Sequence, residues 1–171
     1  MNALVTGAPA GTALAVARAL TTAGGPVTLV SSDTAGLLAA LDAPGMTGVD
    51  VLWADPASPA GCDDAVVHRR LVHATPEALV LAVDDPAEFA LGAALARRLP
   101  GVPWVVAGGT AAAVADAATA LATELGEDTL WALVPGTDPS AVEHRLTDLR
   151  EAAAARPAPL AAAPALGSCA H

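Results

Sequence analysis

Short apolar runs rich in β-branched residues alternate with longer helical stretches from one end of the chain to the other. This alternation is typical of βαβ units, in which a helix joins two parallel strands of one sheet. The sequence therefore predicts an α/β fold, a doubly wound parallel sheet of about six strands with helices on both faces. The expected strands cover about residues 3–6, 26–31, 49–54, 78–83, 102–107 and 130–134. The expected helices cover about residues 11–23, 34–42, 60–74, 86–99, 110–125 and 139–155.

The length and composition are those of one domain. The chain has 171 residues, 54% of them hydrophobic and 15% charged, which is enough apolar material for a sizeable core in a single folded unit. We assign this domain to residues 1–155. Residues 156–171 are rich in Ala and Pro, a composition that supports no regular element, and we expect them to form a flexible tail.

The charge balance excludes several classes of partner. Eighteen acidic residues against eight arginines and no lysine give a formal net charge of -10, which opposes binding to nucleic acids and to anionic membranes. The start of the chain has no basic segment typical of a secretory signal, and no apolar run approaches the roughly 20 residues of a membrane span. We therefore expect a cytoplasmic protein with no nucleic-acid or membrane partner.

A turn with two glycines joins the first expected strand to the first expected helix. It reads Leu4-Val5-Thr6-Gly7-Ala8-Pro9-Ala10-Gly11-Thr12-Ala13. Glycines at this place let backbone N–H groups and the helix N-terminus approach a pyrophosphate. Because the turn follows a strand, opens a helix and begins a βαβ unit, it indicates a Rossmann-like fold. Gly7, Gly11 and Thr12 are the candidate phosphate-binding residues.

The same turn resembles the TGxxxGxG motif of the short-chain dehydrogenase/reductase (SDR) superfamily, with Ala13 in place of the last glycine. Further segments are similar to family motifs and extend the resemblance over about residues 1–136. These segments are Val27-Thr28-Leu29-Val30-Ser31-Ser32-Asp33, Leu52-Trp53-Ala54-Asp55, Ala120-Leu121-Ala122-Thr123-Glu124-Leu125-Gly126 and Leu130-Trp131-Ala132-Leu133-Val134-Pro135-Gly136.

The resemblance implies a dinucleotide cofactor, and the residues favour NAD over NADP. An acid about twenty residues after the glycines can bind a ribose 2′-OH, whereas a 2′-phosphate requires arginine. Residues 31–42 contain Asp33 and no basic residue. In relatives an acid at the position of Asp55 contacts the adenine. Asp33 also precedes an expected helix, so a role as its N-cap is an alternative to cofactor binding.

The resemblance also assigns a catalytic pair that this chain lacks. In the family a tyrosine exchanges a proton with the substrate, and a lysine four residues later lowers the pKa of that tyrosine. The sequence contains neither residue type, and counting back from Glu124 places the two positions at Ala107 and Ala111. A positioned general acid contributes roughly 10²–10⁴ in rate. We therefore do not expect this chain to reduce a carbonyl by itself.

Two more departures from the family pattern concern the substrate cleft. The family's Asn-Ala-Gly after the fourth strand is replaced by a stretch that contains Asp84 and Asp85. The chain also lacks the final strand and the substrate-covering elements of full-length relatives. The resemblance therefore implies a truncated and degenerate member with an open pocket.

The remaining candidate groups are weak. Asp84 and Thr110 lie near the carboxyl edge of the expected sheet, where one of them could serve in acid–base chemistry. Asp85 precedes a proline in the pattern of a helix N-cap. His68 and His73 are five residues apart on one expected helix, which is not the i, i+4 spacing of helical metal pairs. We assign no metal site.

The helix expected at 110–125 carries small residues nearly all round, with Asp116 as its only charge before Glu124. Such a helix can approach another helix closely, and in the family this helix forms the dimer core. Packing on its own sheet is the alternative explanation. We expect a homo- or hetero-oligomer with an SDR-type subunit through the helices around 87–99 and 110–125.

Together these observations favour a non-catalytic SDR-like subunit, a pseudoenzyme that associates with itself or with an active SDR-type oxidoreductase, for example in bacterial secondary metabolism. Two alternatives stay open. One is a cofactor-independent cyclase, dehydratase or isomerase that uses the SDR cleft. The other is an NAD(P)-dependent oxidoreductase completed by a partner subunit.

Overall fold

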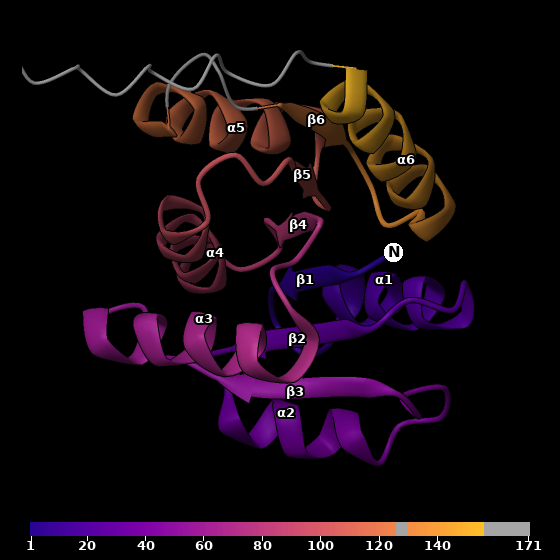
Figure 1. Ribbon diagram of the computed structural model, residues 1–171, viewed down its shortest axis with the longest axis vertical. Helices are drawn as coiled ribbons and strands as arrows, with labels where there is room; N and C mark the ends of the chain where they lie inside the picture. Colours follow the sequence, from indigo (N-terminus) through magenta and orange to yellow (C-terminus); the bar gives the residue numbers. More distant parts are fainter. Residues whose placement is uncertain (126–129, 156–171) are drawn as a thin grey trace, which may run out of the picture.

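The computed structural model describes residues 1–125 and 130–155, in which six strands alternate with six helices (Figure 1). The strands are β1 (Ala3–Thr6), β2 (Val27–Ser31), β3 (Val49–Trp53), β4 (Ala78–Ala82), β5 (Trp104–Ala107) and β6 (Trp131–Val134). The helices are α1 (Gly11–Thr22), α2 (Thr34–Leu41), α3 (Pro59–His73), α4 (Pro86–Arg98), α5 (Ala111–Leu125) and α6 (Pro139–Ala155). Every predicted element is confirmed, with its bounds within about two residues of the prediction.

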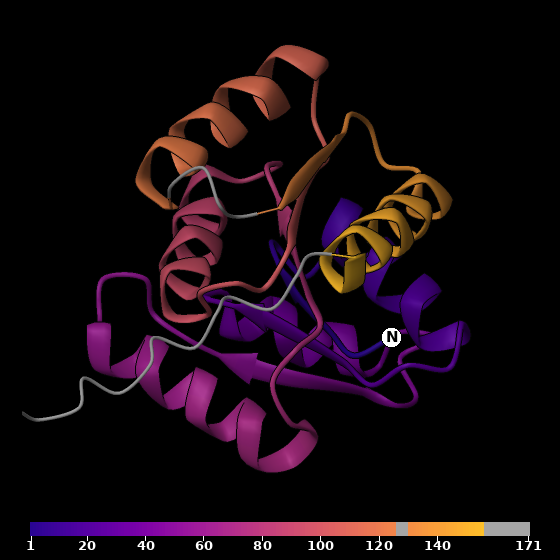
Figure 2. The ribbon, with the colours of Figure 1, turned by 45° about the horizontal axis from the view of Figure 1, so that its top comes forward.

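The strands form one parallel sheet in the order β3-β2-β1-β4-β5-β6. Helices α1, α2 and α6 contribute to the hydrophobic core on one face of this sheet, and α3, α4 and α5 to the core on the other (Figure 2). The predicted doubly wound α/β fold is confirmed.

Alternate residues of each central strand enter the two cores. In β1, Ala3 and Val5 belong to the core beneath α1 and α6, while Leu4 belongs to the core beneath α3 and α4. All five residues of β4 are buried. A parallel sheet covered on both faces requires such continuously apolar strands, which explains the short uninterrupted apolar runs of the sequence.

The order of the strands places a reversal between β1 and β4. Strands β2 and β3 are added on one side of β1. Strands β4, β5 and β6 are then added on the other side of β1. Ligands of doubly wound sheets bind outside the carboxyl ends of the strands at such a reversal. The carboxyl ends of β1 and β4 therefore define the place to search for a site.

An Asp-Pro pair begins each of two helices, α4 and α6. Asp85 Oδ1 accepts hydrogen bonds from the backbone N–H groups of Ala87 (2.8 Å) and Glu88 (3.4 Å) at the start of α4. Asp138 Oδ1 accepts one from the N–H of Ser140 (3.0 Å) at the start of α6. In both helices the next residue is a proline at the first helical position, where no N–H is needed.

A buried arginine ties the end of α3 to the start of the chain. Arg69 has 0% of its surface exposed, and its guanidinium donates to the carbonyl of Ala74 and to the side-chain oxygen of Asn2. The Asn2 amide in turn donates to the carbonyl of His73 (2.8 Å). Burial lowers the pKa of Arg69, and the negative charge of Asp50 opposes that shift.

The residue that ends α3 has a backbone conformation suited to glycine. Ala74 has φ 68° and ψ −178°, and it is the one non-glycine residue with positive φ in the described chain. Such a conformation costs about 1–3 kcal/mol for a residue with a Cβ. We expect Ala74→Gly to stabilise the protein by about 1 kcal/mol, after the greater entropy of glycine in the unfolded chain is subtracted. Urea unfolding followed by circular dichroism measures this change.

The matched control is Ala23→Gly at the end of α1, where φ is −72° and glycine relieves no strain. We expect this control to leave the stability unchanged or lower it slightly. An Ala74→Gly protein no more stable than the unaltered chain would contradict the expectation.

Cys62 of α3 is fully buried and makes no disulfide bond. Burial raises the pKa of the Cys62 thiol, although the nearby charge of Arg98 lowers it in part. The thiolate is the reactive form, so the raised pKa and the lack of solvent access both lower the reactivity of this side chain.

We therefore expect Cys62 to resist alkylation by iodoacetamide at about pH 8 in the native protein. The rate of alkylation should be at least about 100-fold below that of the urea-unfolded chain, because the reagent reaches Cys62 only after local unfolding around α3. The measurement uses a Cys169→Ser variant, which leaves one thiol, with mass spectrometry over time. Equal rates in the native and unfolded states would show that the α3 packing is wrong.

Within residues 1–125 and 130–155, no helix combines the length and the apolar character needed to cross a bilayer. The expected C-terminal tail, residues 156–171, lies outside the described residues.

Candidate functional site

The turn between β1 and α1 packs too tightly at its first glycine for any side chain. Gly7 has φ 151°, and a Cβ at this position would lie 2.7 Å from the Cβ atoms of both Ala13 and Ala82. Gly11, at the start of α1, has φ 56°. Ala10 is the N-cap of α1 and supplies no side-chain hydrogen bond. The N–H groups at the start of α1 therefore need an acceptor from elsewhere.

That acceptor is Asp84, which follows β4. Its Oδ2 accepts a hydrogen bond from the backbone N–H of Thr12 (3.2 Å), and its Oδ1 accepts one from the N–H of Gly109 (3.1 Å). β4 lies between β1 and β5 in the sheet, so one carboxylate links the loops that follow both neighbouring strands. Sequence reasoning placed Asp84 at this edge but did not find these partners.

The glycines after β5 leave room for this carboxylate. Gly108 has φ 97°, and a Cβ there would lie 2.5 Å from Asp84 Oδ1 and 3.1 Å from Thr12 Oγ1. A Cβ on Gly11 would lie 3.3 Å from Asp84 Oδ2. Thr12 itself is buried, and its Oγ1 makes no hydrogen bond to the described residues.

The turn after β2 is also held by the chain's own side chains. Glu88 of α4 is 3% exposed, and its Oε1 accepts hydrogen bonds from the backbone N–H (2.9 Å) and the Oγ (2.6 Å) of Ser32. Trp53 Nε1 donates to the carbonyl of Ser32 (3.1 Å). Glu88 was not predicted; an acid in the first turn of α4 was the one available signal.

The two acids that the resemblance assigns to the nucleotide make local hydrogen bonds. Asp33 Oδ1 accepts from the N–H of Gly36 (3.0 Å), so the N-cap role of Asp33 is confirmed. Asp55 Oδ1 accepts from the N–H of Ala57 (2.9 Å) in the turn before α3. A contact of either acid with a nucleotide stays a prediction.

The positions assigned to the catalytic pair carry no proton donor. Ala107 is the last residue of β5, fully buried between Ala82 of β4 and Val134 of β6. Ala111 is the first residue of α5. Thr110 Oγ1 accepts a hydrogen bond from the N–H of Ala113 (3.2 Å), which is the geometry of a helix cap. Residues 107–111, which join β5 to α5, thus contribute no titratable side chain of their own.

The two histidines of α3 approach one carboxylate. His68 Nε2 lies 3.9 Å and His73 Nε2 3.8 Å from Asp50 Oδ2 on the edge strand β3. His68 is exposed and His73 is partly exposed, as expected of surface residues of this helix, and the strand beneath α3 supplies them with a shared acidic neighbour. In the part of the chain that the structure describes, no group of three potential ligands is arranged to hold a metal ion.

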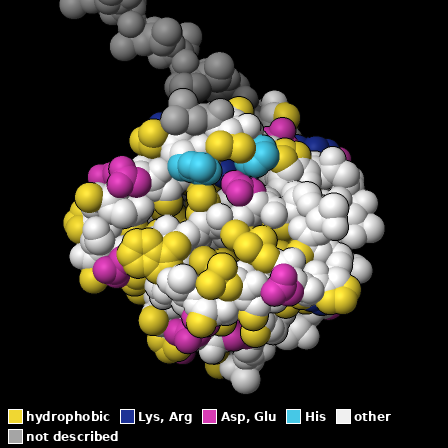
Figure 3. Space-filling view, turned by 90° about the horizontal axis from the view of Figure 1, so that it is seen from below, with side chains coloured by type: hydrophobic (Ala, Val, Ile, Leu, Met, Phe, Trp, Pro, Cys, Tyr) yellow, Lys and Arg dark blue, Asp and Glu magenta, His cyan; other side chains and the backbone are white. Residues whose placement is uncertain are grey.

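The same edge of the molecule exposes large apolar side chains on both sides of β3 (Figure 3). They are Leu38, Leu41, Trp53, Val67 and Val72. A cavity of about 220 Å³ lies on this side, lined by Leu52, Trp53, Gly61, Asp64, Ala65 and His68.

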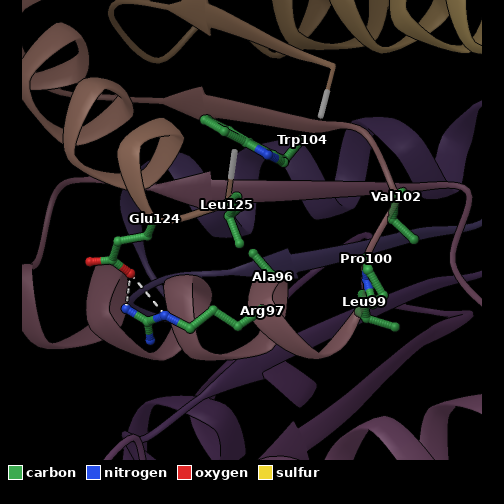
Figure 4. A pocket seen from close by; sticks show the side chains of 9 residues that line it. Ala96, Arg97, Leu99, Pro100, Val102, Trp104, Glu124 and Leu125 are labelled. Atoms are coloured by element: carbon green, nitrogen blue, oxygen red, sulfur yellow. Dashed lines mark hydrogen bonds and ion pairs between the residues drawn. The ribbon is translucent and has the colours of Figure 1, made fainter. Parts of the chain in front are cut away.

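A second cavity, of about 260 Å³, lies at the amino end of β5, where Trp104 faces the last turns of α4 and α5 (Figure 4). Arg97 Nε donates to Glu124 Oε2 (2.8 Å) across its rim, and the buried Trp104 ring stacks on Trp131 with 5.5 Å between centroids. This cavity is at the opposite edge of the sheet from the turn at Gly7, so it is separate from the predicted nucleotide site.

Comparison with known proteins supports the fold. No protein-family model and no curated protein sequence matches the chain. Among solved structures, it is similar to a short-chain type dehydrogenase/reductase from Mycobacterium marinum, with TM-score 0.56 and 18% identity over 75% of this chain and 70% of that one. It is also similar to BdcA from E. coli, with TM-score 0.55 and 17% identity over 90% and 92% of the two chains.

A third similar structure is an NADPH-bound short-chain oxidoreductase from Pseudomonas aeruginosa, described as having an atypical catalytic centre. The TM-score is 0.54 and the identity 16%, over 72% of this chain and 63% of that one. At these identities the similarity shows the fold alone. The chain has an SDR-like Rossmann fold.

A dinucleotide fits this arrangement poorly. The turn at Gly7 and Gly11 has glycines with positive φ and leads into a helix, as a pyrophosphate site requires, yet Asp84 already accepts the N–H of Thr12 at the start of α1. A phosphate and this carboxylate would compete for the same donor, and two anions about 4 Å apart repel each other by about 4 kcal/mol near a protein surface. The expected preference for NAD over NADP stays a prediction.

The packing at Gly7 gives a direct test of the turn. We expect Gly7→Ala to destabilise the protein by about 2–4 kcal/mol, because the new Cβ would overlap Ala13 and Ala82 in an unfavourable backbone conformation. The control Gly24→Ala also has positive φ (88°), but nothing lies within 4 Å of its Cβ position. It should lose only about 1 kcal/mol. Equal losses in the two variants, measured by urea unfolding, would refute the close approach.

Proposed function

We propose that this chain is a non-catalytic protein with an SDR-like fold, a subunit that pairs through α5 with a second copy or with an active SDR-type oxidoreductase. The observation that carries the proposal is the junction of β5 and α5. Ala107 is buried in the sheet and has no proton to exchange, and the Thr110 hydroxyl caps a helix with no titratable side chain among its hydrogen-bond partners. The chain also contains no tyrosine and no lysine.

The outer face of α5 supports a role in association. Val114, Ala118 and Leu121 pack on the sheet, and the opposite side of the helix is exposed. Its exposed residues are Ala111, Ala112, Ala113, Asp116, Thr119, Ala120, Thr123 and Glu124. Small side chains allow a partner helix to approach to the short end of the roughly 8–10 Å packing range.

Helix α4 offers less surface than the sequence suggested. Residues 91–96 of α4 are all buried, and this helix lies between α3 and α5 on the sheet. A partner would therefore contact α5 first, with α4 contributing at most its exposed positions Pro86, Ala87, Ala90 and Arg97.

Native mass spectrometry of the untagged protein from its own host tests the pairing. We expect a stable dimer or a complex with a second polypeptide. Ala120→Arg, on the exposed face of α5, should dissociate it, because a long charged side chain prevents close helix approach. The control Ala152→Arg adds the same charge to an exposed position of α6 and should leave the complex intact. A strict monomer would end the subunit proposal.

The same preparation tests whether the chain has reductase activity. With NADH or NADPH and a panel of ketones, the isolated chain should show no turnover above the uncatalysed rate. Turnover by the purified chain alone would show that it is an active reductase and contradict the proposal.

A further inference from the structure

The Asp84 carboxylate lies where a doubly wound fold receives the phosphates of a dinucleotide. It is at the reversal between β1 and β4, and it accepts the N–H of Thr12 in the first turn of α1. Helix N-termini bind anions because their first N–H groups have no partner within the helix and carry a partial positive charge. In this chain the anion is a side chain of the protein itself.

We propose that Asp84 is a built-in substitute for the cofactor pyrophosphate: its carboxylate links the ends of β1, β4 and β5 and thereby excludes dinucleotides from the carboxyl ends of these strands. The inference is independent of the subunit proposal, since a chain without a proton relay could still bind a dinucleotide. It identifies one residue that determines whether the cleft accepts a phosphate.

The surrounding backbone is shaped around this carboxylate. Gly108, whose Cβ would lie 2.5 Å from Asp84 Oδ1, turns the chain at φ 97° directly before Gly109, the second donor to Asp84. Any side chain at position 108 would displace the carboxylate. Glycines therefore flank the contact on both sides, at the start of α1 and after β5. This arrangement distinguishes Asp84 from a single exposed acid near a helix end.

The charges around Asp84 also disfavour a bound phosphate. Glu88 holds the turn after β2 at Ser32, and its Oε2 is buried with no hydrogen bond to the described residues. Asp33, Asp55 and Asp85 line the same edge of the sheet. Among the described residues, no arginine pairs with any of these five acids. A phosphate would therefore meet uncompensated negative charge.

The test is isothermal titration calorimetry of the full-length chain with inorganic pyrophosphate and, separately, NADH. We expect the unaltered protein to show no saturation up to about 1 mM of either probe. Asp84→Ala frees both N–H groups and removes the charge, and it should bind each probe at least about tenfold more tightly. Asp84→Asn keeps the shape of the side chain but has one acceptor oxygen and no charge. Its affinity for each probe should therefore lie between that of the unaltered chain and that of Asp84→Ala.

Asp85→Asn is the matched control, because Asp85 is adjacent and acidic but caps α4 and has no contact with Thr12 or Gly109. It should bind no better than the unaltered chain. If Asp84→Ala fails to fold, the isosteric Asp84→Asn decides alone. Backbone hydrogen exchange at Thr12 and Gly109 should be faster in that variant, which verifies that the two bonds form in solution.

Two results would overturn the proposal. One is saturable binding of NADH or pyrophosphate by the unaltered chain at micromolar concentration, which would mean that Asp84 moves aside for a phosphate. The other is folded Asp84 variants that bind the probes no better than the unaltered chain. Neither result bears on the subunit proposal, which depends on turnover and on the mass of the assembly.

Discussion

Burial of both faces of a single parallel sheet is the constraint on which the rest of this molecule depends. Each central strand sends alternate side chains into two cores, so the strands are mostly apolar. Asp33, Asp55 and Asp84 accordingly lie just after the strands. There the loops after β1, β4 and β5 must satisfy their own N–H groups, and Asp84 does so for two of them at once.

The elements were predictable because their signals are local. Apolar runs of four to five residues, Asp-Pro pairs before α4 and α6, and a strand–glycine–helix sequence each depend only on neighbouring residues. The partners of Asp84 were not predictable. The sequence shows that an acid follows β4, but it does not show that Thr12 and Gly109 lie on either side of that acid. The two adjacent glycines at 108 and 109 were the available signal, and only the order of strands explains them.

Long-range contacts also account for two features that are not visible in the sequence. Spacing along α3 separates His68 from His73, yet the edge strand beneath the helix supplies Asp50 to both. Glu88 looked like an ordinary first-turn acid of α4, and the fold buries it against Ser32. In each case the partner is distant along the chain: Ser32, just after β2, is 56 residues from Glu88, and Asp50 of β3 lies close to both histidines of α3.

The link through Asp84 has a consequence for how the protein is maintained in a cell. A fold whose cofactor completes its own binding loops gains stability by mass action, and its folded fraction follows the supply of that cofactor. Here the completing anion is covalently part of the chain, at a fixed ratio of one to one. If Asp84 takes the place of the phosphate as proposed, the folded fraction of this protein does not depend on the supply of nucleotide.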